Sequence, residues 1–188
     1  IVVFGGRGEP IQVQPLTVSP DVLINFLENI RAQNGGAWQE DTLGAVRTAV
    51  DRLAWQPRAK KVIILVGDTP PFADDTEPTL DEIRKLRAEN GIFNTVDVTY
   101  EEHKRFLEEY YREIGLPPPK DSRMPEFYFE TQKAYQEMAA AGGGQWRSLT
   151  RDQQINQQVL ILAFGSQWQT EVSAFGRGLV TGRARTDP

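Results

Sequence analysis

The sequence predicts an α/β protein with a mostly parallel sheet, and three observations lead to this class. Apolar segments alternate along the chain with segments of helical periodicity. Residues 62–67 are apolar throughout, which is typical of a central strand covered on both faces of a parallel sheet. A glycine-rich turn joins two extended segments near the start, which indicates a hairpin with one antiparallel edge strand. The chain of 188 residues is long enough for one large domain.

The first elements expected are a β-hairpin, two helices and a strand. Residues 1–4 and 11–16 form the hairpin, and residues 5–10 form its turn. Ser19 or Asp21 can cap the first helix, and its apolar positions follow helical spacing: Leu23, Phe26, Leu27 and Ile30. The apolar positions of the second helix are Leu43, Val46, Val50 and Leu53. This second helix leads into the strand at residues 62–67.

The second half of the chain repeats the helix and strand pattern. A helix over residues 80–86 precedes a strand over residues 92–98. A longer helix from residue 101 has a mixed apolar and aromatic stripe: Phe106, Leu107, Tyr110, Tyr111 and Ile114. After a proline-rich break come a helix over residues 129–141, a short strand over 145–149 and a last helix over 150–162. We expect one domain over residues 1–165, with an insertion at about residues 115–125, and a C-terminal extension over residues 166–188.

Composition excludes several classes of function. The formal net charge of -5 argues against a nucleic-acid surface, which needs a dominant patch of Lys and Arg. No apolar run approaches the ~20 residues of a membrane span. The absence of cysteine excludes disulfides, thiolate nucleophiles and cysteine-ligated metals. Because residues 1–4 already have the pattern of a strand interior, we expect the natural protein to begin earlier.

Asp68 is the strongest site candidate that the residues themselves give. It stands directly after the apolar strand, and residues 69–71 end that strand abruptly. In open α/β sheets, ligands bind in the crevice outside the carboxyl ends of the strands. The alternative interpretation is an aspartate that only caps a turn.

Several motifs along the chain resemble one protein family. The first motif is Ile30-Arg31-Ala32-Gln33-Asn34-Gly35-Gly36-Ala37-Trp38-Gln39-Glu40. It is similar to Leu-Arg-Ala-Gln-Gly-Gly-Gly-Asp-Trp-Pro-Glu, which marks a bacterial subgroup of the von Willebrand factor A (vWA) domains. Further matches lie at residues 54–59, 62–71, 91–92 and 142–143. The order and spacing of these motifs resemble the vWA family over about residues 1–165.

The resemblance implies a doubly wound, Rossmann-like sheet with a metal-ion-dependent adhesion site at its carboxyl edge. In such a site Asp68 would be the third-loop ligand of Mg²⁺ or another divalent cation, and the second-loop ligand would be Glu40 or Thr42. The first-loop motif Asp-x-Ser-x-Ser occurs nowhere in the sequence, so the first strand of the family fold has no counterpart here. Two or three protein ligands would hold Mg²⁺ poorly, because the ion demands near-octahedral oxygen coordination. The missing strand either lies outside this sequence or comes from another chain.

The function implied is a protein–protein interaction module that binds a partner at the carboxyl edge of the sheet. The alternative is a structural subunit of a larger assembly, without a metal site, anchored by residues 115–125 and the C-terminal tail. An enzyme is not expected, because no nucleophile and base occur at a recognisable spacing. The subgroup implies the cell envelope as location, periplasmic or extracellular, with the cytoplasm as alternative.

Four other features have simpler interpretations. Residues 5–8 are expected to form a hairpin turn rather than a phosphate loop, because a strand follows them. His103 is expected to be a solvent-exposed helix residue. An acidic run is expected to cap and charge the next helix rather than bind cations: Asp74, Asp75, Glu77 and Asp81. The aromatic residues around the proline-rich break fit either two packed helices or a partner surface: Phe106, Tyr110, Tyr111, Phe127, Tyr128, Phe129 and Tyr135.

Overall fold

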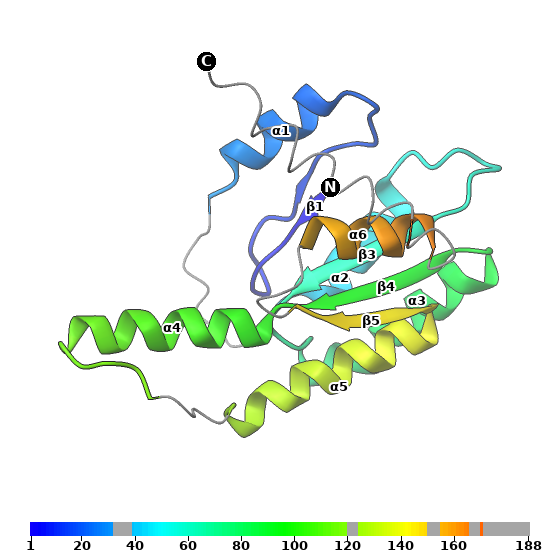
Figure 1. Ribbon diagram of the computed structural model, residues 1–188. Helices are drawn as coiled ribbons and strands as arrows, with labels where there is room; N and C mark the ends of the chain where they lie inside the picture. The colour runs from blue at the N-terminus through cyan, green and yellow to red at the C-terminus, as the bar shows by residue number, and fades with distance from the viewer. Residues whose placement is uncertain (32–38, 120–123, 150–154, 166–169, 171–188) are drawn as a thin grey trace, which may run out of the picture.

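The computed structural model describes residues 1–31, 39–119, 124–149, 155–165 and 170, and it is an α/β structure (Figure 1). The strands are β1 (Val2–Val3), β2 (Gln12–Val13), β3 (Val62–Gly67), β4 (Ile92–Asp97) and β5 (Gly143–Ser148). The α-helices are α1 (Pro20–Asn29), α2 (Thr42–Arg47), α3 (Thr76–Ala88), α4 (Thr99–Glu113), α5 (Glu126–Ala141) and α6 (Ile155–Phe164). A π-helical segment, η1 (Thr48–Arg52), continues α2, and a 3₁₀ turn, η2 (Ala73–Asp75), precedes α3.

The main sheet has three parallel strands in the order β3-β4-β5, as the alternation of strands and helices predicts. The expectation for residues 62–67 is wrong in one respect, because β4 and not β3 is the middle strand among the described residues. Val66 of β3 is 42% exposed, whereas Leu65 is buried in the core. An apolar run indicates that both faces of a strand contact apolar groups. It does not show whether the strand lies in the middle or at the edge of the sheet.

The hairpin near the start forms as predicted, but its place differs from the expectation. β1 and β2 are antiparallel, with Val2 opposite Val13, and they form a separate two-stranded sheet. The expected antiparallel edge strand of the main sheet is therefore not part of that sheet. Turn chemistry predicts that two segments pair with each other, whereas their docking depends on contacts distant in sequence.

Helices cover both faces of the main sheet. Phe93 of β4 is fully buried in a core that also contains Ile83 of α3 and Tyr135 of α5. The next residue, Asn94, donates a hydrogen bond to the carbonyl oxygen of Leu162 in α6 at 3.4 Å. Because successive strand residues point to opposite faces, α6 covers the face opposite α3 and α5, and Figure 1 shows the same arrangement.

Helix α4 starts at the carboxyl end of β4 and extends away from the sheet (Figure 1). Its aromatic stripe is largely exposed: Phe106 is 61%, Tyr110 48% and Ile114 47% accessible. Packing of this stripe against a second helix is therefore not observed for these three side chains. Its buried residues, Thr99 and His103, lie in the first turns, where the helix meets the sheet.

Some expectations fall outside the described part of the chain. The motif at residues 30–40 lies mostly there, as do residues 120–123 of the expected insertion and residues 150–154. The expected C-terminal extension also lies outside it, apart from Thr170. Within the described residues, no helix is long and apolar enough to cross a bilayer.

Candidate functional site

The carboxyl ends of β3 and β4 bring two aspartates to the same edge of the sheet. Gly67 is opposite Asp97 in the parallel register, and Asp68 directly follows Gly67. The hydroxyl of Thr131 donates to the carbonyl oxygen of Asp68 at 3.4 Å, and the hydroxyl of Thr99, whose proton goes to Asp97, lies 3.5 Å from the same oxygen. These contacts, from α4 and α5, hold the loop after β3 in place.

Asp97 is a site residue that the sequence reasoning missed. Its side chain is fully buried, and one carboxylate oxygen accepts the backbone N–H of Thr99 at 2.9 Å and the Thr99 hydroxyl. The other oxygen, Oδ2, has no hydrogen-bond partner among the described residues. A carboxylate near the carboxyl end of the strand at residues 92–98 was the available signal, because the carboxyl ends of parallel strands meet at one edge.

Glu40 and Thr42, the two candidates for the second loop, occupy different environments. Glu40 forms an isolated bridge with Pro71, just past Asp68, so its loop lies against the loop after β3. Thr42 begins α2 and is only 1% exposed, and its backbone N–H donates to the carbonyl oxygen of Glu40 at 2.8 Å. The Glu40 carboxyl lies near enough to Asp68 for the two charges to repel, and Thr42 is buried at the start of α2.

The carboxyl groups at this edge of the sheet have raised pKa values, partly because their charges repel one another. Burial raises the pKa of the Asp68 carboxyl, and Arg105 of α4 partly opposes this rise. Burial also raises the pKa of Glu40, and repulsion from Asp68 adds to it. The Thr69 hydroxyl lies near enough to Glu40 to oppose that rise, although it makes no hydrogen bond of normal geometry. The result is a partly buried acidic group with few compensating contacts.

The negative charge of Asp68 also raises the pKa of two further carboxyl groups. Burial raises the pKa of Asp97, and repulsion from Asp68 adds to it despite the bonds from Thr99. Burial raises the pKa of Glu102 in α4, where Arg105 opposes the rise and Asp68 adds to it. We call Glu40, Asp68, Asp97 and Glu102 the acidic cluster.

Tyr135 packs closely against Gly67 at the end of β3. It is 1% exposed, and a methyl group built on Gly67 would lie 2.3 Å from the Tyr135 hydroxyl. Burial raises the pKa of Tyr135 well above its ordinary value, with further contributions from Glu40, Asp68 and Asp97. Gly67 is thus required by close packing with Tyr135 at the end of β3.

The residues that the structure describes do not by themselves make a complete site for a divalent metal. Among the described residues, no group of three or more His, Cys, Asp or Glu side chains is arranged to hold an ion. Asp68 and Glu40 supply two carboxylates, and Thr42 is enclosed by protein. Ca²⁺ and Mg²⁺ need six or more oxygen ligands, whereas an ammonium or guanidinium group needs only a few acceptors.

His103 is buried, which corrects the expectation of an exposed helix residue. It is 8% exposed, its ring lies 5.0 Å from that of Tyr128, and its Nε2 has no partner among the described residues. Burial lowers the pKa of His103. The surrounding sequence is strongly charged, but His103 lies in the first turns of α4, where the helix still contacts the sheet.

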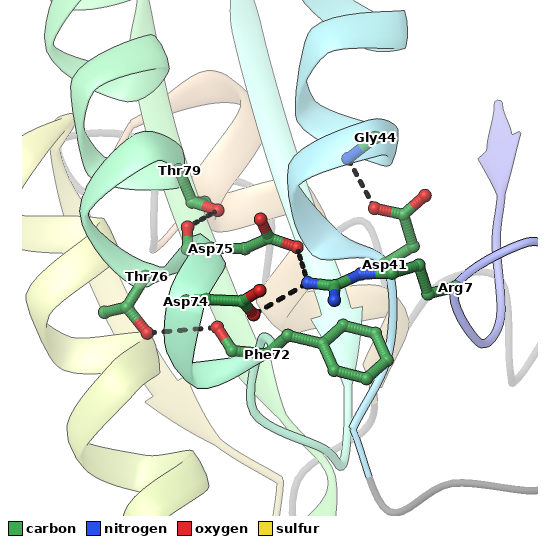
Figure 2. A network of polar contacts seen from close by, with 8 residues as sticks. All are labelled: Arg7, Asp41, Gly44, Phe72, Asp74, Asp75, Thr76 and Thr79. Atoms are coloured by element: carbon green, nitrogen blue, oxygen red, sulfur yellow. Dashed lines mark hydrogen bonds and ion pairs between the residues drawn. The ribbon is translucent and has the colours of Figure 1, made fainter.

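Asp74 and Asp75 of the acidic run after Asp68 pair with an arginine from the hairpin turn (Figure 2), whereas Glu77 and Asp81 pair with Arg84. Arg7 donates to Asp74 at 2.7 Å and to Asp75 at 2.6 Å, and its guanidinium lies 4.1 Å from the centre of the Phe72 ring. The hydrogen bonds of Arg7 lower the pKa of Asp74 and raise that of Arg7. Asp75 stands at the start of α3 but makes no side-chain cap.

Two sets of contacts connect the hairpin to the main sheet. One is the glycine-rich turn, and the other is the pair of ion pairs from Arg7 to Asp74 and Asp75, which we call the clamp. The backbone N–H of Asp41 donates to the carbonyl oxygen of Gly5 at 2.8 Å, and Asp41 itself caps α2 through the N–H of Gly44. The turn interpretation of residues 5–8 is consistent with this geometry, since β2 and not a helix follows it. The pairing of Arg7 with Asp74 and Asp75 was not predictable from local patterns, because the partners lie more than 60 residues apart in the chain.

Comparison with protein-family models, with curated proteins and with solved structures gave no match for this chain. The resemblance to vWA domains therefore stays a prediction from the sequence motifs.

Proposed function

We propose that this chain is a protein–protein interaction module with a doubly wound fold of vWA type, which binds a partner protein at the carboxyl edge of its sheet. The acidic cluster is the observation that supports this proposal best. Asp68 acts on three other carboxyls, and Arg105 is the basic group that opposes it. A cationic group of a partner would relieve this repulsion by pairing with the partly exposed carboxyls of Asp68 and Glu40.

The exposed face of α4 supports the same proposal. Its first turn lies at the acidic cluster, because Asp97 binds Thr99, and the helix then leads outward. Phe106 and Tyr110 stack with ring centres 6.3 Å apart, and Tyr110 meets the Tyr111 ring edge to face at 5.4 Å. Exposed aromatic groups beside an arginine are typical of protein interfaces. The proposed partner thus presents a basic side chain next to an apolar surface.

The experiment is affinity capture by the immobilised chain, with identification of the bound proteins. Asp68→Asn should reduce capture of the specific partner at least about tenfold, because the cationic group loses its main charge partner. Asp81→Asn is the matched control, since Asp81 is an exposed aspartate of α3 that pairs with Arg84. Capture that is equal for wild type and Asp68→Asn would refute the role of this edge.

The positive charge at the acidic cluster can come from a side chain of the partner or from a divalent ion. Experiments can distinguish these two sources. Calorimetric titration with Mg²⁺ should give no heat of specific binding if a partner side chain supplies the charge. Capture that depends on Mg²⁺ and is abolished by EDTA would instead assign the ion to Asp68 and Glu40, with partner oxygens completing its coordination.

A second candidate function is a structural subunit of a larger assembly. Ile114 and Leu116, at the start of the proline-rich break, are 47% and 58% exposed, and burial by a neighbouring subunit would explain them. In that case a protease should cleave near Leu116 in the isolated chain but not in the assembly. Equal cleavage in both would contradict the structural role.

A further inference from the structure

Helix α4 is attached to the rest of the chain by its first turns. Its buried residues are Thr99 and His103, which lie one helical turn apart on the same face. Phe106 and Tyr110, further along the helix, are largely exposed. The orientation of α4 relative to the sheet therefore depends on how Thr99 and His103 are held.

These two buried residues make different contacts. The backbone N–H and the hydroxyl of Thr99 both donate to Asp97, which fixes the first residue of the helix. The ring of His103 packs against Tyr128 near the start of α5, with the two ring planes tilted by 59°. The Nε2 atom of His103 is enclosed and has no hydrogen-bond partner among the described residues. If this ring left its place, Thr99 would remain as the buried anchor of α4.

Protonation of His103 is unfavourable where its ring lies. An imidazole gains a proton and a positive charge as the pH falls through its pKa, which is about 6.5 for an exposed histidine. In the charged form both ring nitrogens are donors. The enclosed Nε2 faces no acceptor in the described part of the chain, so the charged ring is favoured only where it reaches water. Burial lowers the pKa of His103 for this reason.

Neighbouring charges do not compensate for this burial. The titratable groups that the meeting elements carry here are Asp68 after β3, Asp97 of β4, Glu126, Tyr128 and Glu130 of α5, and Glu101, Glu102, Lys104 and Arg105 of α4. Burial is the cause of the lowered pKa of His103, and no charge among the described residues contributes to it. Glu101 has a buried oxygen without a partner, but residues two apart on a helix do not face each other.

We propose that His103 is a pH-sensitive latch, which holds the start of α4 against α5 when its imidazole is neutral and releases the helix when the imidazole is protonated. Thr99 stays bound to Asp97, so the released helix pivots about its first residue. Arg105, which opposes the charge of Asp68, moves with the helix. The latch thus gives the carboxyl edge of the sheet two arrangements, one on each side of the His103 titration.

The carboxyls near α4 respond to acid with the opposite sign. Glu102 and Asp68 repel each other when both are charged, and protonation of either removes this repulsion. Acidification therefore strengthens the attachment of α4 through the carboxyls and weakens it through His103. A loosening of α4 at low pH identifies the histidine as its cause.

The test is amide hydrogen exchange of the whole chain between about pH 7.5 and pH 5, expressed as protection factors so that the intrinsic pH dependence of exchange cancels. Protection of α4 should fall at least about threefold on acidification, and more than that of α3. The sequence contains one histidine, so the imidazole NMR signals report His103 alone. The midpoint of the fall should coincide with the midpoint of the His103 titration, below the ordinary value.

Two variants that cannot be protonated at this position are the controls. His103→Phe keeps an aromatic ring against Tyr128 and should keep α4 protected throughout this pH range. His103→Gln is the second control in case the phenyl ring disturbs the packing, and the protection of its α4 should not fall on acidification, whatever its starting level.

The proposal is overturned by unchanged protection of α4 in the wild-type chain, by an equal fall in both variants, or by an ordinary pKa of His103. Control of partner binding by this latch rests on the function proposed above, whereas these measurements involve no partner. Their failure would leave that function standing, and the capture experiment with Asp68→Asn tests it separately.

Discussion

Replacement of Asp68 by asparagine should make the isolated chain more stable, because Asp68 lies in a group of carboxyls that repel one another. Its charge raises the pKa of Glu40, Asp97 and Glu102, and Arg105 is the group that opposes it. Three repulsive pairs and one attractive pair leave two repulsions without compensation. At about 0.5 kcal/mol for each partly screened pair, the free energy of unfolding should rise by about 1 kcal/mol at pH 8.

The pH dependence of this effect has a definite sign. A carboxyl whose pKa is raised in the folded state binds more protons there than in the unfolded state, at pH values between its two pKa values. The wild-type chain should therefore lose stability as the pH rises from about 4 through the raised pKa values of Asp68 and Glu40. Asp68→Asn should reduce this loss, so the two proteins should differ most at pH 8 and least at pH 4.

Urea unfolding followed by circular dichroism measures this difference. An increase of about 1 kcal/mol should move the midpoint at pH 8 upwards by about 0.5 M. Asp81→Asn is the control, and it should give no increase because it removes an exposed ion pair with Arg84. A lower midpoint for Asp68→Asn at pH 8, or the same increase at pH 4, would refute the reasoning.

Three other changes test the packing around the site. Gly67→Ala should destabilise the chain by about 1–3 kcal/mol in urea unfolding, because the new methyl group meets the Tyr135 hydroxyl, and Tyr135→Phe should recover part of this loss; equal effects in both backgrounds would contradict the contact. Phe106→Ser should change the free energy of unfolding by less than about 0.5 kcal/mol, because the ring is 61% exposed, and a large loss would show that α4 packs on other parts of the chain. Arg7→Ala should speed amide hydrogen exchange in β1 and β2, because the ion pairs with Asp74 and Asp75 are lost, and unchanged exchange would mean that the clamp does not hold the hairpin.

Much of the fold follows from local sequence patterns. The apolar run at residues 62–67 predicts a strand, the helical spacing before it predicts a helix, and both elements occur where they are expected. The place of β3 in the sheet does not follow from such patterns, because it depends on which segments pair across long sequence distances. The aromatic stripe of α4 has the spacing of a core helix but is largely exposed, since spacing reports one common face and not what that face contacts.

The candidate site was predictable only in part. The position of Asp68 directly after an apolar strand marks the carboxyl edge of the sheet, whereas Glu40 reaches Asp68 from the loop before α2 through its bridge with Pro71. Asp97 fits the same rule and was missed because it lies inside the predicted strand rather than after it. The burial of His103 was not predictable, because its neighbours in sequence are charged and its contacts with Tyr128 come from another helix.

The most direct test of the central claim is an NMR titration of the side-chain carboxyl carbons in the isolated chain. The account predicts that Asp68 and Glu40 titrate above the ordinary pKa values of aspartate and glutamate, and that Asp68→Asn lowers the pKa of Glu40. Ordinary pKa values for Asp68 and Glu40, or a Glu40 titration that Asp68→Asn leaves unchanged, would contradict it.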